Sequence, residues 1–308
     1  MTVVPVFALI AAGFAAVKLK FISEGAHRGI SEFAFSVAIP ALLFRTIVIA
    51  DFPAASAFEI WAAYYGSVAL AWIGVALVSR LGKADSARDG AVLAVGSVYG
   101  NLAMLGLPLT LSALGNEAAG PMALILAINN PLLWLGGMLQ IAWSERQAAD
   151  TTASLVVPLF SQLARNPIMI AIVCGFLWRF TGAGLHPVAD KTINLLGQAG
   201  SPTALVALGI SLVRFTTNGQ KMQIALMCAV KLLAMPALAW GLAVHVFKLP
   251  HIAVGVVVMF AAMPAGANAY LFAVQYRRLE NSVSGAVALG SIFAALTIPL
   301  VIFLIDRS

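Results

Sequence analysis

Apolar segments long enough to cross a lipid bilayer recur along this chain from one end to the other. A transmembrane α-helix needs about 20 consecutive apolar residues to span the hydrocarbon core of a bilayer. Ten segments approach or exceed this length: 3–17, 30–49, 58–78, 91–114, 119–143, 167–180, 192–213, 222–247, 252–274 and 283–305. The sequence therefore predicts an all-α polytopic membrane protein with ten transmembrane helices.

The composition excludes a soluble globular fold. About 61% of the 308 residues are hydrophobic and about 10% are charged, whereas soluble domains carry about 25% charged residues. In a soluble protein, the net charge of +6 would suggest a nucleic acid partner. In a membrane protein, the same excess is typical of cytoplasmic loops. We therefore expect the lipid bilayer as a partner, and no nucleic acid.

Lysine and arginine residues are distributed unevenly between the two sides of the predicted membrane. The loops that follow odd-numbered segments hold about 12 of the 18 basic residues, and the opposite loops hold about five. Because basic residues accumulate in cytoplasmic loops, we expect the odd-numbered loops in the cytoplasm. Both termini are then expected on the outer side.

The two halves of the chain share residues at a constant shift of 162 positions. The matched pairs are Pro5 with Pro167, Gly13 with Gly175, Phe14 with Phe176, and Pro40 with Pro202. Each half then holds five segments, and two units with an odd number of spans enter the membrane from opposite sides. This predicts an inverted repeat, as in many secondary transporters, with halves at 1–145 and 166–308 and a cytoplasmic connector at 146–165.

The fourth segment carries residues that interrupt a helix near its middle. The stretch 99–108 includes Gly100, Asn101, Gly106 and Pro108, and glycine and proline both disfavour helix interiors. Backbone left unpaired in hydrocarbon costs several kcal/mol per group, so a break is tolerated only where protein buries it or where it lines a wet cavity. We therefore predict a functional break in this segment.

The ninth segment repeats this combination at the corresponding position of the second half. The stretch 263–270 includes Pro264, Gly266 and Asn268. Paired interruptions in corresponding spans indicate the solute site of a transporter. The alternative is a pair of proline kinks whose asparagine side chains bond to neighbouring helices.

The chemistry of such breaks favours an anionic solute. A helix that begins at mid-membrane directs free N–H groups and a partial positive charge at whatever lies there. Asn101 and Asn268 add hydrogen-bond donors without a net charge to desolvate. We therefore predict a secondary carrier of small organic anions, most simply carboxylates.

Three further polar residues lie inside the predicted spans. Lys231, near the middle of the eighth segment, either offers a positive charge to the solute or bonds to a backbone break. Asn129 and Asn130 precede Pro131 in the fifth segment. One of these two asparagines is expected to face the site, and the alternative is a hydrogen bond between helices.

Other function classes have less support in the sequence. No aspartate or glutamate lies in the middle of a segment, which argues against a cation antiporter. Cation-coupled symport of a larger amphipathic anion is the second carrier hypothesis. An intramembrane enzyme would need a converging nucleophile and base, and a channel would have less use for breaks at mid-depth. We expect no cofactor and no metal, because no motif for either occurs.

The interrupted segments resemble those of the auxin efflux carrier family, which includes plant auxin exporters and bacterial carriers of the malonate or malate type. The stretch 101–109, NLAMLGLPL, is similar to the N-x-x-x-x-G-x-P-L motif of the family's fourth helix. Further similar stretches are 35–44, 205–212 and 264–276. The resemblance covers nearly the whole chain.

The resemblance implies an architecture and a mechanism. The fold would be a five-plus-five inverted repeat similar to sodium/bile acid symporters and sodium/proton antiporters, in which broken helices four and nine cross. An elevator mechanism would move a transport domain, about 57–145 and 220–308, against a scaffold domain, about 1–50 and 166–214. Because the connector is much shorter than the central loop of the plant exporters, their phosphorylation control is not expected here.

The resemblance also implies site residues and a location. Asn101 would contact the substrate carboxylate, and either Asn129 or Asn130 would contribute from the fifth helix. We expect a multi-pass protein of the bacterial inner membrane, and we consider a homodimer as its assembly.

Overall fold

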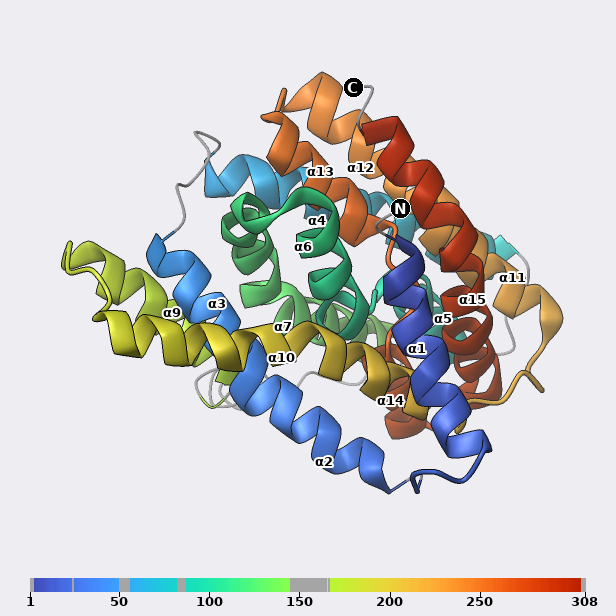
Figure 1. Ribbon diagram of the computed structural model, residues 1–308. Helices are drawn as coiled ribbons and strands as arrows, with labels where there is room; N and C mark the ends of the chain where they lie inside the picture. Colours follow the sequence, from blue (N-terminus) through green and yellow to red (C-terminus); the bar gives the residue numbers. More distant parts are fainter. Residues whose placement is uncertain are drawn as a thin grey trace. The chain divides into compact units, whose positions relative to one another are not determined.

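The computed structural model describes residues 3–23, 25–49, 56–81, 87–144, 165 and 167–305, and regular structure in these ranges is helical apart from one isolated β-bridge (Figure 1). Within them, six helical stretches are long and apolar enough to span a membrane: Ala26–Ile49, Ala57–Arg80, Asn116–Ile141, Pro187–Leu212, Lys221–Val246 and Glu280–Ile305. Shorter apolar helices are Val4–Lys18, Leu102–Leu114, Pro167–Phe180 and His251–Ala261. An all-helical, multi-pass fold is confirmed, while the number of ten spans stays a prediction. Apart from Arg165, the predicted connector lies outside the described residues.

The helices belong to two compact units. Unit 1 comprises Met1–Ala54, Ala103–Ala127 and Val157–Arg214, and unit 2 comprises Ala55–Leu102, Ile128–Val156 and Phe215–Ser308. The helices of unit 1 are α1 (Val3–Lys18), α2 (Ala26–Phe33), α3 (Ile39–Ile49), α6 (Leu107–Leu114), α9 (Pro167–Phe180) and α10 (Pro187–Leu212). Those of unit 2 are α4 (Ala57–Leu81), α5 (Ala87–Val98), α11 (Lys221–Ala229), α12 (Met235–Gly241), α13 (His251–Ala261), α14 (Ala267–Tyr276) and α15 (Glu280–Ile305). Residues of α7 (Ala119–Ser144) belong to both units.

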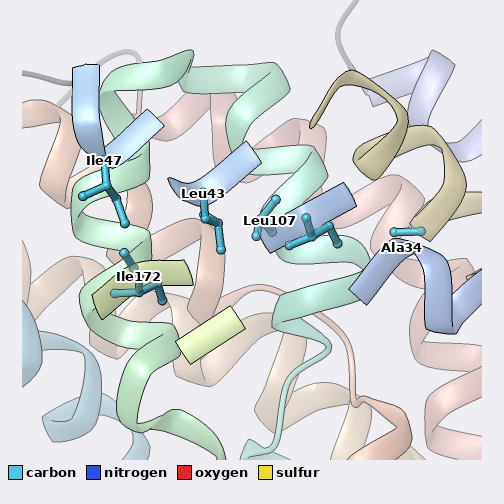
Figure 2. Packing of buried hydrophobic residues seen from close by; sticks show 8 residues of the cluster. Ala34, Leu43, Ile47, Leu107 and Ile172 are labelled. Atoms are coloured by element: carbon cyan, nitrogen blue, oxygen red, sulfur yellow. The ribbon is translucent and has the colours of Figure 1, made fainter. Parts of the chain in front are cut away.

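Unit 1 has a core of buried aliphatic side chains from several helices. Figure 2 shows Leu43 and Ile47 of α3 in one cluster with Leu107 of α6 and Ile172 of α9. All four side chains are at most 4% exposed. Because lipid tails are as apolar as these side chains, close van der Waals packing rather than escape from water holds such helices together.

Two glycines allow α1 and α10 of unit 1 to pack closely. A Cβ atom at Gly13 would overlap the carbonyl oxygen of Val206, and one at Gly209 would overlap the carbonyl oxygen of Ile10. Small residues at a helix interface let two backbones approach each other in this way. The closeness of α1 and α10 therefore depends on the absence of side chains at these two positions.

A Gly209→Val variant is expected to be less stable than the wild type by about 1–3 kcal/mol, the usual cost of overpacking a filled interface. Thermal unfolding of the purified protein in detergent measures this difference. Gly74→Ala is the control, because a Cβ atom there meets nothing within 4 Å. Equal melting temperatures for Gly209→Val and the wild type would contradict the close approach of α1 and α10.

Three prolines each follow a π-helical turn. The turns are Ala34–Ala38 before Pro40, Leu102–Gly106 before Pro108, and Val230–Ala234 before Pro236. Proline has no N–H, and in a regular α-helix its ring clashes with the carbonyl group four residues earlier. A π turn widens the helix locally and lets the chain continue past the proline. In the second case, the π turn that begins at Leu102 runs directly into α6, which contains Pro108.

Candidate functional site

The interruptions predicted in the fourth and ninth segments meet within unit 2. The first lies between α5, which ends at Val98, and the π turn that begins at Leu102. The second lies between α13, which ends at Ala261, and α14, which begins at Ala267. Gly100 and Ala265 form an isolated antiparallel β-bridge. Two stretches separated by more than 150 residues therefore lie side by side.

Two backbone hydrogen bonds close this bridge. The Asn101 N–H donates to the Pro264 carbonyl oxygen at 2.8 Å, and the Gly266 N–H donates to the Tyr99 carbonyl oxygen at 2.9 Å. Each break supplies the other with partners for groups that a continuous helix would have bonded internally. This pairing offsets the cost of placing non-helical backbone in an apolar surrounding.

A side chain would be crowded on both sides of the bridge. A Cβ atom at Gly266 would lie 3.0 Å from the Asn101 Cα and 3.1 Å from the Asn101 nitrogen. At Gly100, it would lie 2.9 Å from Cε of Lys231 and 3.1 Å from its Nζ. Glycine therefore leaves room for the close approach of the two backbones and of the lysine side chain.

Asn101 and Asn268, the two asparagines predicted to bind the solute, lie one at each break, where helical structure starts again. Asn101 directly precedes the π turn at Leu102, and its side chain is buried, with 6% exposed. Asn268 lies in the first turn of α14 and is half-buried. The first N–H groups of a helix have no partner within it and carry a partial positive charge. The two asparagines thus add their side-chain polar groups to two helix N-termini.

Asn130 connects the two breaks, and Asn129 does not. The Asn130 Oδ1 accepts a hydrogen bond from the Tyr99 hydroxyl at 3.0 Å and one from Asn268 Nδ2 at 3.3 Å. Asn129 is 2% exposed and accepts a longer bond, 3.5 Å, from the Tyr64 hydroxyl. Asn130 is exposed, whereas Asn129 is buried.

Lys231 is buried behind the bridge. Its side chain is 1% exposed, and its Nζ donates to the Ala261 carbonyl oxygen at 2.6 Å and lies 3.2 Å from the Met235 sulfur. Ala261 ends α13, and the last carbonyl groups of a helix have no internal partner and carry a partial negative charge. Of the two roles considered for Lys231, the bond to the Ala261 carbonyl oxygen fits the one in which the lysine bonds to a backbone break. Contact of Lys231 with a solute stays a prediction.

The other predicted positions have mainly backbone roles. Pro264 contributes the carbonyl group that accepts from Asn101. Gly106 ends the π turn and Pro108 is the second residue of α6, so these two residues lie in continuous helical structure of unit 1 and not in the break where they were predicted. Among the described residues, no three His, Cys, Asp or Glu side chains are grouped to hold a metal ion.

Sequence reasoning did not single out the side chain of Tyr99, which contacts Asn130 beside the breaks. Its side chain is 1% exposed, yet its hydroxyl reaches the exposed Asn130. A buried tyrosine hydroxyl usually has a hydrogen-bond partner, so a tyrosine directly before a predicted break was a signal. The identity of the partner depends on packing between segments and could not be inferred from it.

Comparison with known proteins reveals similarity along nearly the whole chain. The family model described as "Membrane transport protein" matches residues 1–302. A "Putative malonate transporter" of Rhizobium meliloti (strain 1021) is 23% identical over 308 residues, covering 98% of this chain and 94% of that protein. The "Auxin efflux carrier component 8" of Arabidopsis thaliana is 24% identical over 357 residues, with 98% and 96% covered. The "Lysosomal cholesterol signaling protein" of Mus musculus is 23% identical over 247 residues, which cover 75% of this chain and 28% of that protein.

Proposed function

This chain belongs to the auxin efflux carrier family of membrane transport proteins, and from this premise we propose that it is a secondary active transporter of small organic anions. The family consists of transporters, so the chain is a membrane transporter and not an enzyme. The proposal adds the class of solute, the place where the solute binds and the way in which it crosses.

The paired breaks of unit 2 are the observation that carries this proposal. The bridge between Gly100 and Ala265 sets two helix starts beside each other, and both favour negative charge. Asn101, Asn130 and Asn268 add polar groups that carry no net charge. A carboxylate gains hydrogen bonds from such groups without forcing the protein to bury a counter-charge when the site is empty. The buried Lys231 amine lies next to Gly100, and we propose that it adds positive charge when an anion is bound.

We propose an elevator mechanism for the crossing. In it, helices four and nine of a ten-helix inverted repeat cross at the two breaks, and the transport domain carries the solute past the scaffold domain. The odd number of spans in each half, the matched residues at a shift of 162 positions and the paired breaks support this part of the proposal. The basic residues of the odd-numbered loops support outer termini, and we propose the bacterial inner membrane as the location.

Malonate is the first solute to test, because one relative that covers nearly the whole chain is named for it. Purified protein in liposomes loaded with unlabelled malonate should take up labelled malonate in a saturable way. Uptake should be slower when the inside holds no exchangeable anion, because a carrier returns faster when loaded. Uptake that rises linearly with concentration and ignores the internal anion would indicate a pore. If no mono- or dicarboxylate were exchanged, the proposed class of solute would be wrong.

A further inference from the structure

Lys231 has fewer hydrogen-bond acceptors around it than a charged lysine can use. A lysine ammonium group has three N–H donors, whereas a neutral amine has two. The Lys231 Nζ donates to the Ala261 carbonyl oxygen at 2.6 Å and contacts the sulfur of Met235, a weak acceptor, at 3.2 Å. Its side chain is 1% exposed, and among the described residues it forms no ion pair. The two acceptors match the two donors of a neutral amine.

The charged side chains on the surrounding helices do not supply a counter-charge to Lys231. The π turn Val230–Ala234 packs against α5, α11, α12 and α15, and the Lys231 Nζ contacts the end of α13. The charged and histidine side chains within these helices lie in their first turns: Arg88 and Asp89 in α5, Lys221 in α11, His251 in α13 and Glu280 in α15. Lys221 and Lys231 are ten positions apart, as are His251 and Ala261, and ten residues extend about 15 Å along a helix.

The two carboxylates of these helices are similarly remote from the bridge. Asp89 lies eleven positions before Gly100 and pairs with Arg278 at 3.8 Å. Glu280 is the first residue of α15 and lies ten positions before Gly290, where α15 approaches the end of α11. Each is therefore separated from the level of Lys231 by about three helical turns.

The nearer ionisable groups are the Tyr99 phenol and the Cys228 thiol, and groups of both kinds are uncharged at neutral pH. A protonated Lys231 would therefore be a buried charge without a counter-charge as long as the solute site is empty. Burying such a charge costs far more than burying a neutral polar group, and a buried base generally releases its proton instead. The helix starts at the two breaks carry partial positive charge, which adds to this cost.

An anion at the paired breaks would change this balance, because it is the counter-charge that the empty protein lacks. The Lys231 Nζ lies beside Gly100, 3.1 Å from the position that a Cβ atom would take there. At an effective dielectric constant of about 20, a single negative charge about 7 Å from Nζ raises the affinity of the amine for a proton about 50-fold. By thermodynamic linkage, protonation of the amine strengthens anion binding by the same factor.

We propose that Lys231 carries a coupling proton: it is neutral in the empty carrier and protonated while an anion is bound, so that one proton crosses the membrane with each anion. This inference rests on the proposed function and adds a driving force to it. The proton comes from water on the side where the anion enters, adds to the lone pair of Nζ, and returns to water where the anion leaves. A lysine thus replaces the intramembrane carboxylates that commonly relay protons.

Proton uptake on malonate binding tests this inference. Calorimetry on the full-length protein in detergent, in two buffers with different heats of ionisation, counts the protons taken up per malonate. At about pH 8 both malonate carboxyl groups are ionised, so any proton taken up goes to the protein. We expect roughly 0.5–1 proton per malonate in the wild type. The affinity for malonate should fall as the pH rises from about 7 to about 9, because the protonated amine becomes rarer.

Lys231→Met cannot take up this proton. It should bind malonate more weakly, by up to about 50-fold, and without proton uptake. His251→Gln is the matched control, because it removes a titratable group at the far end of the helix that Lys231 contacts. Its proton count should equal that of the wild type.

A liposome measurement on the wild type does not depend on the folding of Lys231→Met. With equal malonate on both sides and acid outside, the proton gradient should drive malonate into the liposomes. No accumulation would contradict the coupling. Malonate binding by the wild type without proton uptake, or the same proton count in Lys231→Met, would overturn the role of Lys231 while the proposed function stands. A wild type that binds no carboxylate at any pH would overturn both.

Discussion

Replacing Gly266 by valine is expected to abolish transport and to lower the free energy of unfolding by about 2–4 kcal/mol, from overpacking and from the loss of bridge hydrogen bonds. The new Cβ atom would lie 3.0 Å from the Asn101 Cα and 3.1 Å from its nitrogen. These are backbone atoms, which cannot swing aside as a side chain does. The backbone of Gly266 has φ −101° and ψ 169°, an extended conformation open to any residue, so the effect is steric.

The strain falls on both hydrogen bonds of the bridge. If Asn101 moves away from residue 266, the bonds from Asn101 to Pro264 and from Gly266 to Tyr99 lengthen together. Counterflow in liposomes measures the loss of transport, and thermal unfolding in detergent measures the loss of stability. Gly290→Ala is a suitable control, because a Cβ atom there lies 3.4 Å from Pro264 Cβ, which is an ordinary contact. Wild-type stability and transport in Gly266→Val would show that the two breaks are not paired as described.

Replacing Lys231 by methionine is expected to have the second largest effect. Methionine fills most of the space of the lysine stem but has no N–H group. In the wild type, the Lys231 Nζ donates to the Ala261 carbonyl oxygen at 2.6 Å, and the variant leaves this oxygen without its donor. A buried acceptor without a partner costs about 1–3 kcal/mol. The positive charge that we propose behind the bridge when an anion is bound is lost as well, so we expect lower stability together with weaker anion binding.

The two proposed roles of Lys231 predict different patterns. A bond to the break requires the unfolding temperature of the solute-free protein to fall, whereas a charge used only for the solute would weaken binding at unchanged stability. Met235→Leu is the control, since it removes only the sulfur contact to the Lys231 Nζ. A Lys231→Met variant with wild-type stability and wild-type anion affinity would contradict both roles.

Residue type marked the breaks at Gly100 and at Pro264 to Gly266, but it also marked Gly106 and Pro108, which lie in continuous helical structure because a π turn accommodates the proline. Gly100, Pro264 and Gly266 disfavour a helix wherever they occur, and the apolar segments around them set their depth. The pairing of the breaks was not derivable from local pattern, because it joins backbone atoms that every residue possesses. The family resemblance, rather than periodicity, implied that helices four and nine meet.

Side-chain partners were the part that the sequence left open. Asn129 and Asn130 are neighbours, and successive residues of a helix point in different directions, so only the packing of α7 distinguishes them. Lys231 bonds a carbonyl group of α13, and a backbone acceptor has no sequence signature. Both ambiguities concern contacts between segments far apart in the chain, where residue type constrains the chemistry but not the partner.

The most direct test of the account is malonate binding by Asn101→Ala compared with the wild type. A ligand that binds only the folded state adds about 2.7 kcal/mol of stability at 100 times its dissociation constant, so thermal shift and calorimetry can be read together. Asn116→Ala, at an exposed position, is the matched control. We predict that malonate stabilises the wild type and Asn116→Ala, and that Asn101→Ala loses most of this stabilisation while the solute-free protein remains folded. Equal malonate affinity in all three proteins would contradict an anion site at the paired breaks.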